Sequence, residues 1–251
     1  MSTDCLNESD ISIMRVKKRS ASLSLSQQAY DLIRTGILKG QFPMGAPLSR
    51  RQLASQLGTS FLPVSEALQR LESEGMVESR PRVGTRVRVP TSQDIRGHYV
   101  IREALESQSA RLFAEKASSQ EREELRRMAE RLDRLYADPA GDLFETFSFH
   151  ERLHRRIAEC TGCPALSEAI ERNHILIFNW LYNSASQFNK LPSRWHQSLI
   201  EVLAKGDPGR ADQKMREHVT YGMEEVLRRL EPVLGWNGSR SLAFSKPRLK
   251  K

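Results

Sequence analysis

Two of the six histidines in this 251-residue sequence lie four residues apart, at His150 and His154. Residues at this spacing share one face of a helix, so both imidazole rings would project into the same space. Neutral imidazole nitrogens are good ligands for zinc, nickel and similar ions. The pair therefore marks a candidate metal site. His196 and His218 fall on later predicted helices and are candidates to extend it.

The same stretch also suggests an enzyme. Residues 150–154 read His-Glu-Arg-Leu-His, the HExxH pattern of zinc metallopeptidases, in which Glu151 would be the general base. The usual continuations of this motif are missing. Ile157 and Cys160 stand where one class needs glycine and histidine, and His174 lies near the place where another needs glutamate. A metal with four protein ligands is also closed to catalytic water. We therefore expect no enzymatic activity and keep a metallopeptidase as the alternative.

The net charge of +8 is unevenly distributed. Residues 11–90 carry 13 Lys and Arg against 5 Asp and Glu, whereas residues 91–232 are nearly neutral. This distribution favours an N-terminal unit that binds a polyanion and a second unit with another task. No apolar run approaches the roughly 20 residues of a membrane span, and the N-terminus has no signal-peptide core. Three cysteines cannot form a disulfide framework, so a cytoplasmic location is expected.

Helical periodicity begins at Leu25. Two short helices are predicted near residues 49–57 and 61–73, around a Gly-Thr-Ser turn whose Ser60 is the expected N-cap. Residues 76–79 and 85–89 then have the pattern of two strands around a basic tip. This order predicts a winged helix-turn-helix over residues 25–90. The second of the paired helices would enter the major groove of DNA, and the wing would contact phosphate or the minor groove.

Every segment beyond Pro90 has a helical pattern. Ser118 with Glu121 fits a capping box, and Asp207 before Pro208 is a good helix start. His98 and His174 have no partner by spacing and are expected to be ordinary bundle residues. The expected helices lie near residues 92–117, 119–137, 142–160, 164–188, 193–205 and 208–231, with Pro232 ending the last.

These patterns together predict a mostly α fold. A winged helix-turn-helix of three helices plus a β-hairpin wing is followed by an all-α antiparallel helical bundle. The bundle is expected over residues 91–232, and it contains the candidate metal site. The tails at residues 1–24 and 233–251, the second of them basic, are expected to be disordered.

The chain resembles the GntR family of bacterial regulators, in its FadR-like branch with an FCD-type C-terminal domain, over about residues 25–230. The stretches that carry the resemblance are GAPLSRRQLA at 45–54, EALQRLESEGMV at 66–77, RVGT at 82–85, IREALE at 101–106, and residues 154–164. The resemblance implies a homodimer on a palindromic double-stranded DNA operator. It also implies a small-molecule effector in the helical domain that alters the affinity for DNA.

The recognition helix departs from the family pattern. Where the family typically has two arginines, this chain has Phe61 and Ser65. Arginine binds guanine O6 and N7 with two hydrogen bonds, worth roughly 1–3 kcal/mol of discrimination. Phenylalanine cannot do this, although it can pack on a thymine methyl, so we expect an operator unlike the family's usual half-site. A ligand-binding protein with a vestigial DNA-binding domain remains an alternative. The residues predicted to contact DNA are Arg50, Arg51, Ser60, Phe61, Leu62, Ser65, Arg70, Arg80, Arg82, Gly84 and Arg86.

The resemblance also implies a metal site, built in the family from an Asp and a His four apart and one His from each of two later helices. His154, His196 and His218 match the three histidines, and His150 stands at the Asp position. Four imidazole nitrogens would shift the preference away from hard, oxygen-seeking ions, so zinc or nickel is the expected cofactor. The effector is expected to be an organic acid. Arg102 matches a pocket-facing arginine and would bind its carboxylate, unless it forms a salt bridge with a neighbouring acid.

Overall fold

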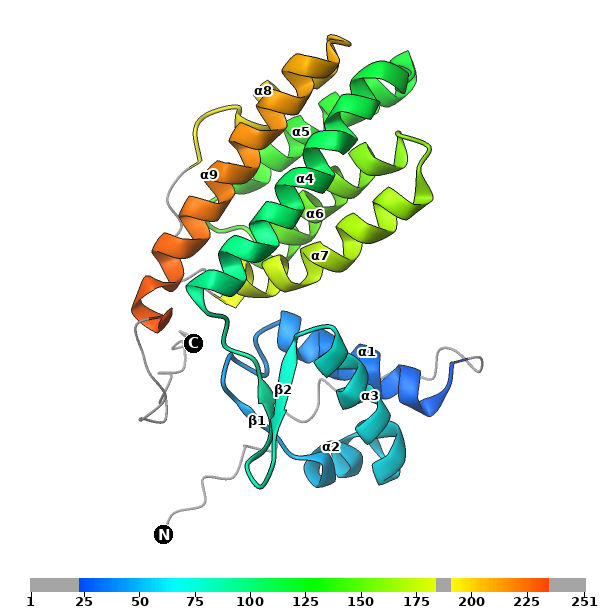
Figure 1. Cartoon of the computed structure of the whole chain (residues 1–251), viewed down its shortest axis with the longest axis vertical. Coiled ribbons are helices and arrows are strands. Elements are labelled where there is room, and N and C mark those ends of the chain that lie inside the picture. Colours follow the sequence, from blue (N-terminus) through cyan, green and yellow to red (C-terminus); the bar gives the residue numbers. More distant parts are fainter. Residues whose placement is uncertain (1–22, 184–190, 235–251) are drawn as a thin grey trace. The chain divides into compact units, whose positions relative to one another are not determined.

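The computed structural model describes residues 23–183 and 191–234, which divide into two compact units (Figure 1). Among the described residues, the first unit comprises 23–37 and 46–88, and the second comprises 38–45, 89–183 and 191–234. The tails expected to be disordered, at 1–24 and 233–251, lie almost entirely outside the described residues. None of the helices in the described part of the chain is long and apolar enough to cross a membrane.

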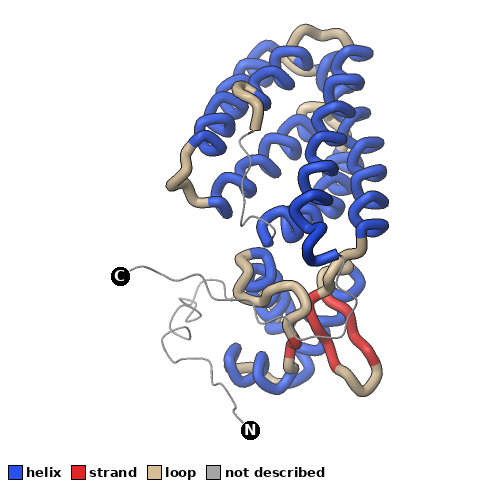
Figure 2. Tube along the Cα trace, turned by 90° about the vertical axis from the view of Figure 1, so that its left-hand side faces the viewer, coloured by secondary structure: helices blue, strands red, loops and turns tan. Residues whose placement is uncertain are grey.

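The first unit consists of three helices and a small antiparallel sheet. Its elements are α1 (Leu25–Leu38), β1 (Pro47–Leu48), α2 (Arg50–Leu57), α3 (Phe61–Ser73), β2 (Val77–Arg80) and β3 (Gly84–Val87). The strand order is β1-β3-β2, with Val77 opposite Val87 and Arg80 opposite Gly84. Figure 2 shows that the strands of the described chain all belong to this unit. The predicted winged helix-turn-helix fold is confirmed.

The turn between α2 and α3 sets the angle of the helix-turn-helix. Gly58 has a φ of 62° and ends α2, with its N–H directed at the carbonyls of Ala54 and Ser55. Glycine is favoured there because a Cβ disfavours this left-handed conformation. Ser60 occupies the N-cap position of α3 as predicted, but its side chain makes no capping hydrogen bond. The inward face of α3 (Val64, Leu68 and Leu71) is at most 1% exposed and forms the core of the unit.

Strand β1 was not predicted. Pro47 and Leu48 pair with Arg86 and Thr85 of β3, almost forty residues further along the chain. A two-residue strand has no sequence period of its own, and the glycines and prolines around it indicated only a turn. It forms because β3 supplies its hydrogen-bonding partner, and Pro47 is tolerated because β1 is an edge strand.

The second unit is an all-helical bundle. Its helices are α4 (Ser92–Lys116), α5 (Ser119–Ala137), α6 (Leu143–Glu159), α7 (Pro164–Asn183), α8 (Trp195–Leu203) and α9 (Pro208–Leu234). Helix α4 packs along α9, α6 along α7, and α5 along α8. The predicted capping box is present, because Ser118 Oγ accepts from the Glu121 N–H while the Glu121 carboxylate accepts from the Ser118 N–H. The part of the predicted helix 164–188 beyond residue 183 lies outside the described residues.

The prediction that Pro232 ends the last helix was wrong. Helix α9 continues through this residue to Leu234. A proline removes a single backbone donor, so a helix can continue past it for less than a turn before its end.

Candidate metal centre and DNA-binding surface

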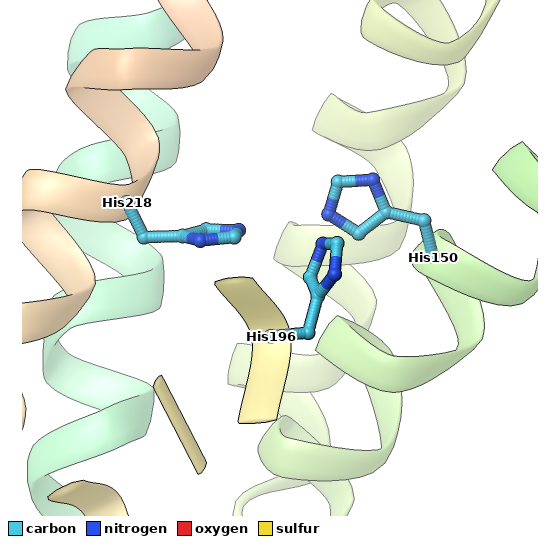
Figure 3. Close-up of side chains that lie close together, drawn as sticks. All are labelled: His150, His196 and His218. Atoms are coloured by element: carbon cyan, nitrogen blue, oxygen red, sulfur yellow. The ribbon is translucent and has the colours of Figure 1, made fainter. Parts of the chain in front are cut away.

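Three histidines from three different helices converge inside the bundle. His150 comes from α6, His196 from α8 and His218 from α9, and their ligand nitrogens all lie within 4.8 Å of one another (Figure 3). The three side chains are buried, with at most 9% of each residue exposed. We call these three residues the histidine cluster. Three imidazoles around one small space form an arrangement that can hold a zinc-like ion.

Hydrogen bonds orient the imidazoles of this cluster. His196 Nδ1 lies 2.7 Å from Asp133 Oδ1 on α5. A carboxylate can only accept, so Nδ1 carries the hydrogen and Nε2 presents its lone pair. The hydroxyl of Tyr136 lies 3.0 Å from His150 Nδ1. Within the described chain, His196 Nε2 and His218 Nδ1 are buried and have no hydrogen-bond partner. Buried polar atoms are rarely left unpaired, and a metal ion in the cluster would satisfy both.

The protonation state of the cluster also suits a metal. Burial and the neighbouring histidines hold the pKa of His150 and of His218 well below the usual range. Burial also lowers the pKa of His196, although the carboxylate of Asp133 opposes part of this effect. All three imidazoles are therefore neutral at pH 7, the form in which a ring nitrogen can bind a metal.

His154 lies beside the cluster. Its Nε2 is 2.8 Å from His150 Nε2, and its Nδ1 is 2.5 Å from Glu106 Oε2. The group of ligand atoms within 4.8 Å of one another comprises His150, His196 and His218, without His154. The structure therefore brings together three of the four predicted ligands and places the fourth within hydrogen-bonding distance of one of them. A ligand role for His154 stays a prediction.

Glu106 of α4 joins His154, beside the cluster, to a buried ionic network. One of its oxygens lies 2.5 Å from Arg102 Nε and 2.5 Å from His174 Nε2. His174 Nδ1 is also paired with the carboxylate of Glu151. Although burial lowers the pKa of His174, Glu151 and Glu106 outweigh it and raise this pKa to about 9. Sequence spacing indicated an ordinary bundle residue at His174, whereas the structure places it between two carboxylates from two other helices.

This ionic network affects two of the expectations from the sequence, the general base Glu151 and the effector-binding Arg102. Glu151, the possible general base of the HExxH pattern, is paired with His174. The Glu151 carboxylate therefore forms an ion pair with a residue of α7, whereas the motif would require it to act as a general base. Arg102 pairs with a neighbouring acid, Glu106, and its NH2 group lies 3.5 Å from His154 Nε2. The guanidinium is therefore buried and ion-paired, next to the cluster.

A small cavity of about 50 Å³ opens beside the cluster. It has space for an ion and a few ligand atoms, since one water needs roughly 10–15 Å³ on this measure. Its walls are aromatic side chains together with two arginines and a glutamate. The lining residues are Tyr99, Arg102, Tyr136, Phe147, His150, Leu191, Trp195, His196, His218, Tyr221, Gly222, Glu225 and Arg229. Sequence reasoning had identified only Arg102 and the histidines among them.

The predicted DNA-binding residues lie on α2, α3 and the wing of the first unit. Most are exposed: Arg51, Ser60, Phe61, Leu62, Arg70, Arg80, Arg82 and Gly84, with Arg50, Ser65 and Arg86 partly so. The guanidinium of Arg70 is held within the unit, 3.8 Å from the ring centre of Tyr30 and 2.8 Å from Gln27 Oε1. Arg86 is paired with Glu78 on the neighbouring strand. Contact of each of these residues with DNA stays a prediction.

Both units of the chain match families of known proteins. The FCD domain model matches residues 98–221, and the model described as "Bacterial regulatory proteins, gntR family" matches residues 25–87. The chain is 31% identical over 212 residues to the "Probable D-xylose utilization operon transcriptional repressor" of Paenarthrobacter nicotinovorans, covering 80% of this chain and 88% of that protein. It is 24% identical over 208 residues to the "HTH-type transcriptional repressor RspR" of Escherichia coli K12, covering 80% and 89%.

The fold is also similar to that of a solved structure. The structure "E. coli McbR/YncC" matches with a TM-score of 0.68 at 24% sequence identity, covering 82% of this chain and 99% of that one. At this level of identity the match concerns the fold.

Proposed function

Given that the chain belongs to the GntR family of bacterial regulators and carries an FCD domain, we propose that a metal ion and an organic-acid effector in its helical unit control how tightly it binds DNA. Proteins of this family are DNA-binding transcriptional regulators, not enzymes. The observation that carries the proposal is the histidine cluster, with two buried ring nitrogens that have no partner within the described residues.

The metal ligands would be His150, His196 and His218, with His154 as the fourth. Nitrogen ligands favour zinc or nickel over calcium and magnesium. When bound, the ion would act as a Lewis acid that attracts the carboxylate of an effector. Asp133 would hold His196 in the tautomer that presents Nε2, and Tyr136 would orient His150.

The cavity beside the cluster would receive the effector. Arg102 and Arg229 both line it and would bind a carboxylate, in exchange for part of their present pairing with Glu106 and Glu225. Arg102 is already paired with Glu106 through Nε, and its NH2 group lies 3.5 Å from His154 Nε2, so an effector would bind the remaining N–H groups of the guanidinium. An effector can shift the DNA-binding equilibrium only if it binds two conformations unequally. With about 50 Å³ of space, the present conformation is the one that a bulky acid would bind less well.

The regulator would act as a homodimer on a palindromic operator, one winged unit on each half-site. Support for a self-contact comes from α4, where Val100 and Ile101 are 66% and 49% exposed. These two adjacent apolar side chains form a small exposed surface that a second copy would cover.

Metal binding is tested first, on protein stripped with a chelator and titrated with zinc or nickel by calorimetry. We expect one ion per chain, and at least tenfold weaker binding for His196→Ala and for His218→Ala. His98→Ala is the matched control, because His98 bonds Asn173 outside the cluster. Zinc binding that survives loss of both His196 and His218 would contradict the assignment.

DNA binding is tested by selecting duplexes from a random pool, with and without the bound metal. We expect a palindrome whose affinity changes when small organic acids are added. Because phosphate contacts dominate affinity, binding should also weaken steeply with salt. Failure to enrich any duplex at low salt, with the metal bound, would leave the helical unit as a ligand-binding module.

A further inference from the structure

The part of the first unit that would read bases is apolar. Phe61 and Leu62 are the first two residues of α3 and are 57% and 65% exposed. Large apolar side chains with this exposure are few in the described chain, and these two are adjacent on a single helical turn. Val64, in the same turn, is fully buried, so α3 is fixed in the unit with its first two side chains outward.

Phe61 and Leu62 lie at the part of the helix-turn-helix that contacts the bases of DNA. In a helix-turn-helix the second helix enters the major groove, and its N-terminal residues contact the base edges. Phe61 and Leu62 stand at that end of α3. Neither side chain can donate or accept a hydrogen bond. The one apolar feature that a base pair offers in the major groove is the C5-methyl group of thymine.

Polar readers near this end are few. Ser60, at the N-cap, is exposed and makes no capping hydrogen bond, but a hydroxyl can bond either a donor or an acceptor on a base edge and so discriminates little. The hydroxyl of Ser65, one turn further along α3, donates to the carbonyl of Phe61 at 3.0 Å and is therefore engaged within the helix. Arg70 is the basic residue of the last turn of α3, and its guanidinium lies over Tyr30. The remaining arginines of this surface, such as Arg51 on α2 and Arg82 on the wing, can supply phosphate contacts, which position a protein on DNA without reading its sequence.

We propose that this regulator selects its operator through thymine methyl groups, which pack against Phe61 and Leu62 in the major groove. The inference rests on the DNA-binding function and adds the chemical group that is recognised. Affinity comes from the arginines, and discrimination comes from burial of methyl groups against the two apolar side chains. We expect such a half-site to have thymine, on at least one DNA strand, at the base pair that faces the N-terminal end of α3.

Deoxyuridine tests the methyl group alone, because it lacks the methyl and keeps every hydrogen-bonding group of thymine. Each thymine of the selected operator is replaced singly by deoxyuridine, and binding of the wild-type dimer is measured by fluorescence anisotropy at fixed salt. We expect about a fourfold loss of affinity at one or two thymines per half-site, the value of one buried methyl group at about 0.8 kcal/mol. Replacing that thymine with cytosine and then with 5-methylcytosine should show the same gain from the methyl group.

Variants assign the effect to residues. Phe61→Ala with Leu62→Ala should bind thymine and deoxyuridine operators equally. Leu25→Ala is the matched control, because Leu25 is also 57% exposed but begins α1, and it should retain the discrimination. Phe61→Arg should shift the selected base toward guanine.

Two negative results are distinguishable. An enriched operator whose affinity is insensitive to deoxyuridine at every position would overturn methyl recognition and leave the regulator intact. The same holds if the double variant still discriminates between thymine and deoxyuridine. Absence of any enriched duplex would overturn DNA binding itself, and methyl recognition with it.

Discussion

Asp133 connects two helices and one candidate metal ligand. Its Oδ1 accepts from His196 Nδ1 and from the His196 backbone N–H, and its Oδ2 accepts from the Gln197 backbone N–H at 3.1 Å. The carboxylate thus both fixes the imidazole and caps the start of α8, where Arg194, at the N-cap position, makes no side-chain capping bond. This double role makes Asp133 the positioning residue of the histidine cluster.

Replacing Asp133 by Asn should weaken zinc binding by roughly 10–100-fold, the usual effect of losing a carboxylate behind a metal-bound histidine. The amide removes the negative charge that makes the imidazole more basic. Competition with a chelating dye measures the affinity, and ¹⁵N NMR of His196 reports its tautomer. Asp212→Asn, which breaks an ion pair with Arg216 on α9, is the control and should bind zinc normally. Equal zinc affinity in the Asp133 and Asp212 variants would contradict a positioning role.

The spacing of residues along the sequence predicted part of this site. It missed the rest because those contacts join different helices. His150 and His154 were identified because a helix places residues four apart on one face. Asp133 could have been found in the same way, since it follows buried Ala129 by four residues and is thus an acid on the apolar side of α5. His174 could not, because its partners Glu106 and Glu151 lie on other helices, and only tertiary packing brings them together.

At the level of elements, the α2–α3 turn determines how the recognition helix is presented. Replacing Gly58 by Ala should lower the free energy of unfolding by about 1–2 kcal/mol, because a Cβ is disfavoured at its left-handed φ. The space around the glycine is open, so the backbone conformation is the whole cause. Urea unfolding at fixed protein concentration measures the change. Gln56→Ala, exposed on α2, should stay within roughly 0.5 kcal/mol of the wild type, and an equal loss in both variants would contradict the argument.

Helices and strands that depend on neighbouring residues were predictable from the sequence. Those that depend on residues far along the chain were not. The start of α5 follows from its own capping residues, Ser118 and Glu121. Helix α9 likewise starts directly after Asp207, whose Oδ1 accepts from the Arg210 N–H at 3.1 Å. Strand β1, by contrast, exists only through its ladder with β3. Local residue preferences therefore predicted the helices of the fold and left out its smallest strand.

For the whole molecule, the buried histidines predict how stability depends on pH. His174 has a pKa raised to about 9, so its stabilisation is complete below the ordinary histidine pKa of 6.5 and is lost as the pH rises toward 9. The pKa values of His150 and His218 are lowered instead, so they add no penalty above 6.5 and a growing one below it. The metal-free protein should therefore be most stable near pH 6.5.

Thermal unfolding of chelator-treated protein between pH 5 and about 10 tests this profile. Loss of His174, as in His174→Gln, should flatten the alkaline side of the curve and leave the acid side in place. Bound zinc should reduce the acid loss, since the metal competes with protons for the same nitrogens. A stability maximum at pH 9, or an alkaline side unchanged in the His174 variant, would show that the buried imidazolium does not contribute as argued.

The two faces of α3 differ in burial, and under the proposed DNA recognition this difference has an evolutionary consequence. Val64, Leu68 and Leu71 hold the helix in the fold, whereas Phe61 and Leu62 project from it and contribute little to its packing. If Phe61 and Leu62 read the operator as proposed, mutation at these positions would give a duplicated gene a new set of target promoters without endangering the folding of its product. Regulators built on this helix can diverge in their targets faster than in their architecture.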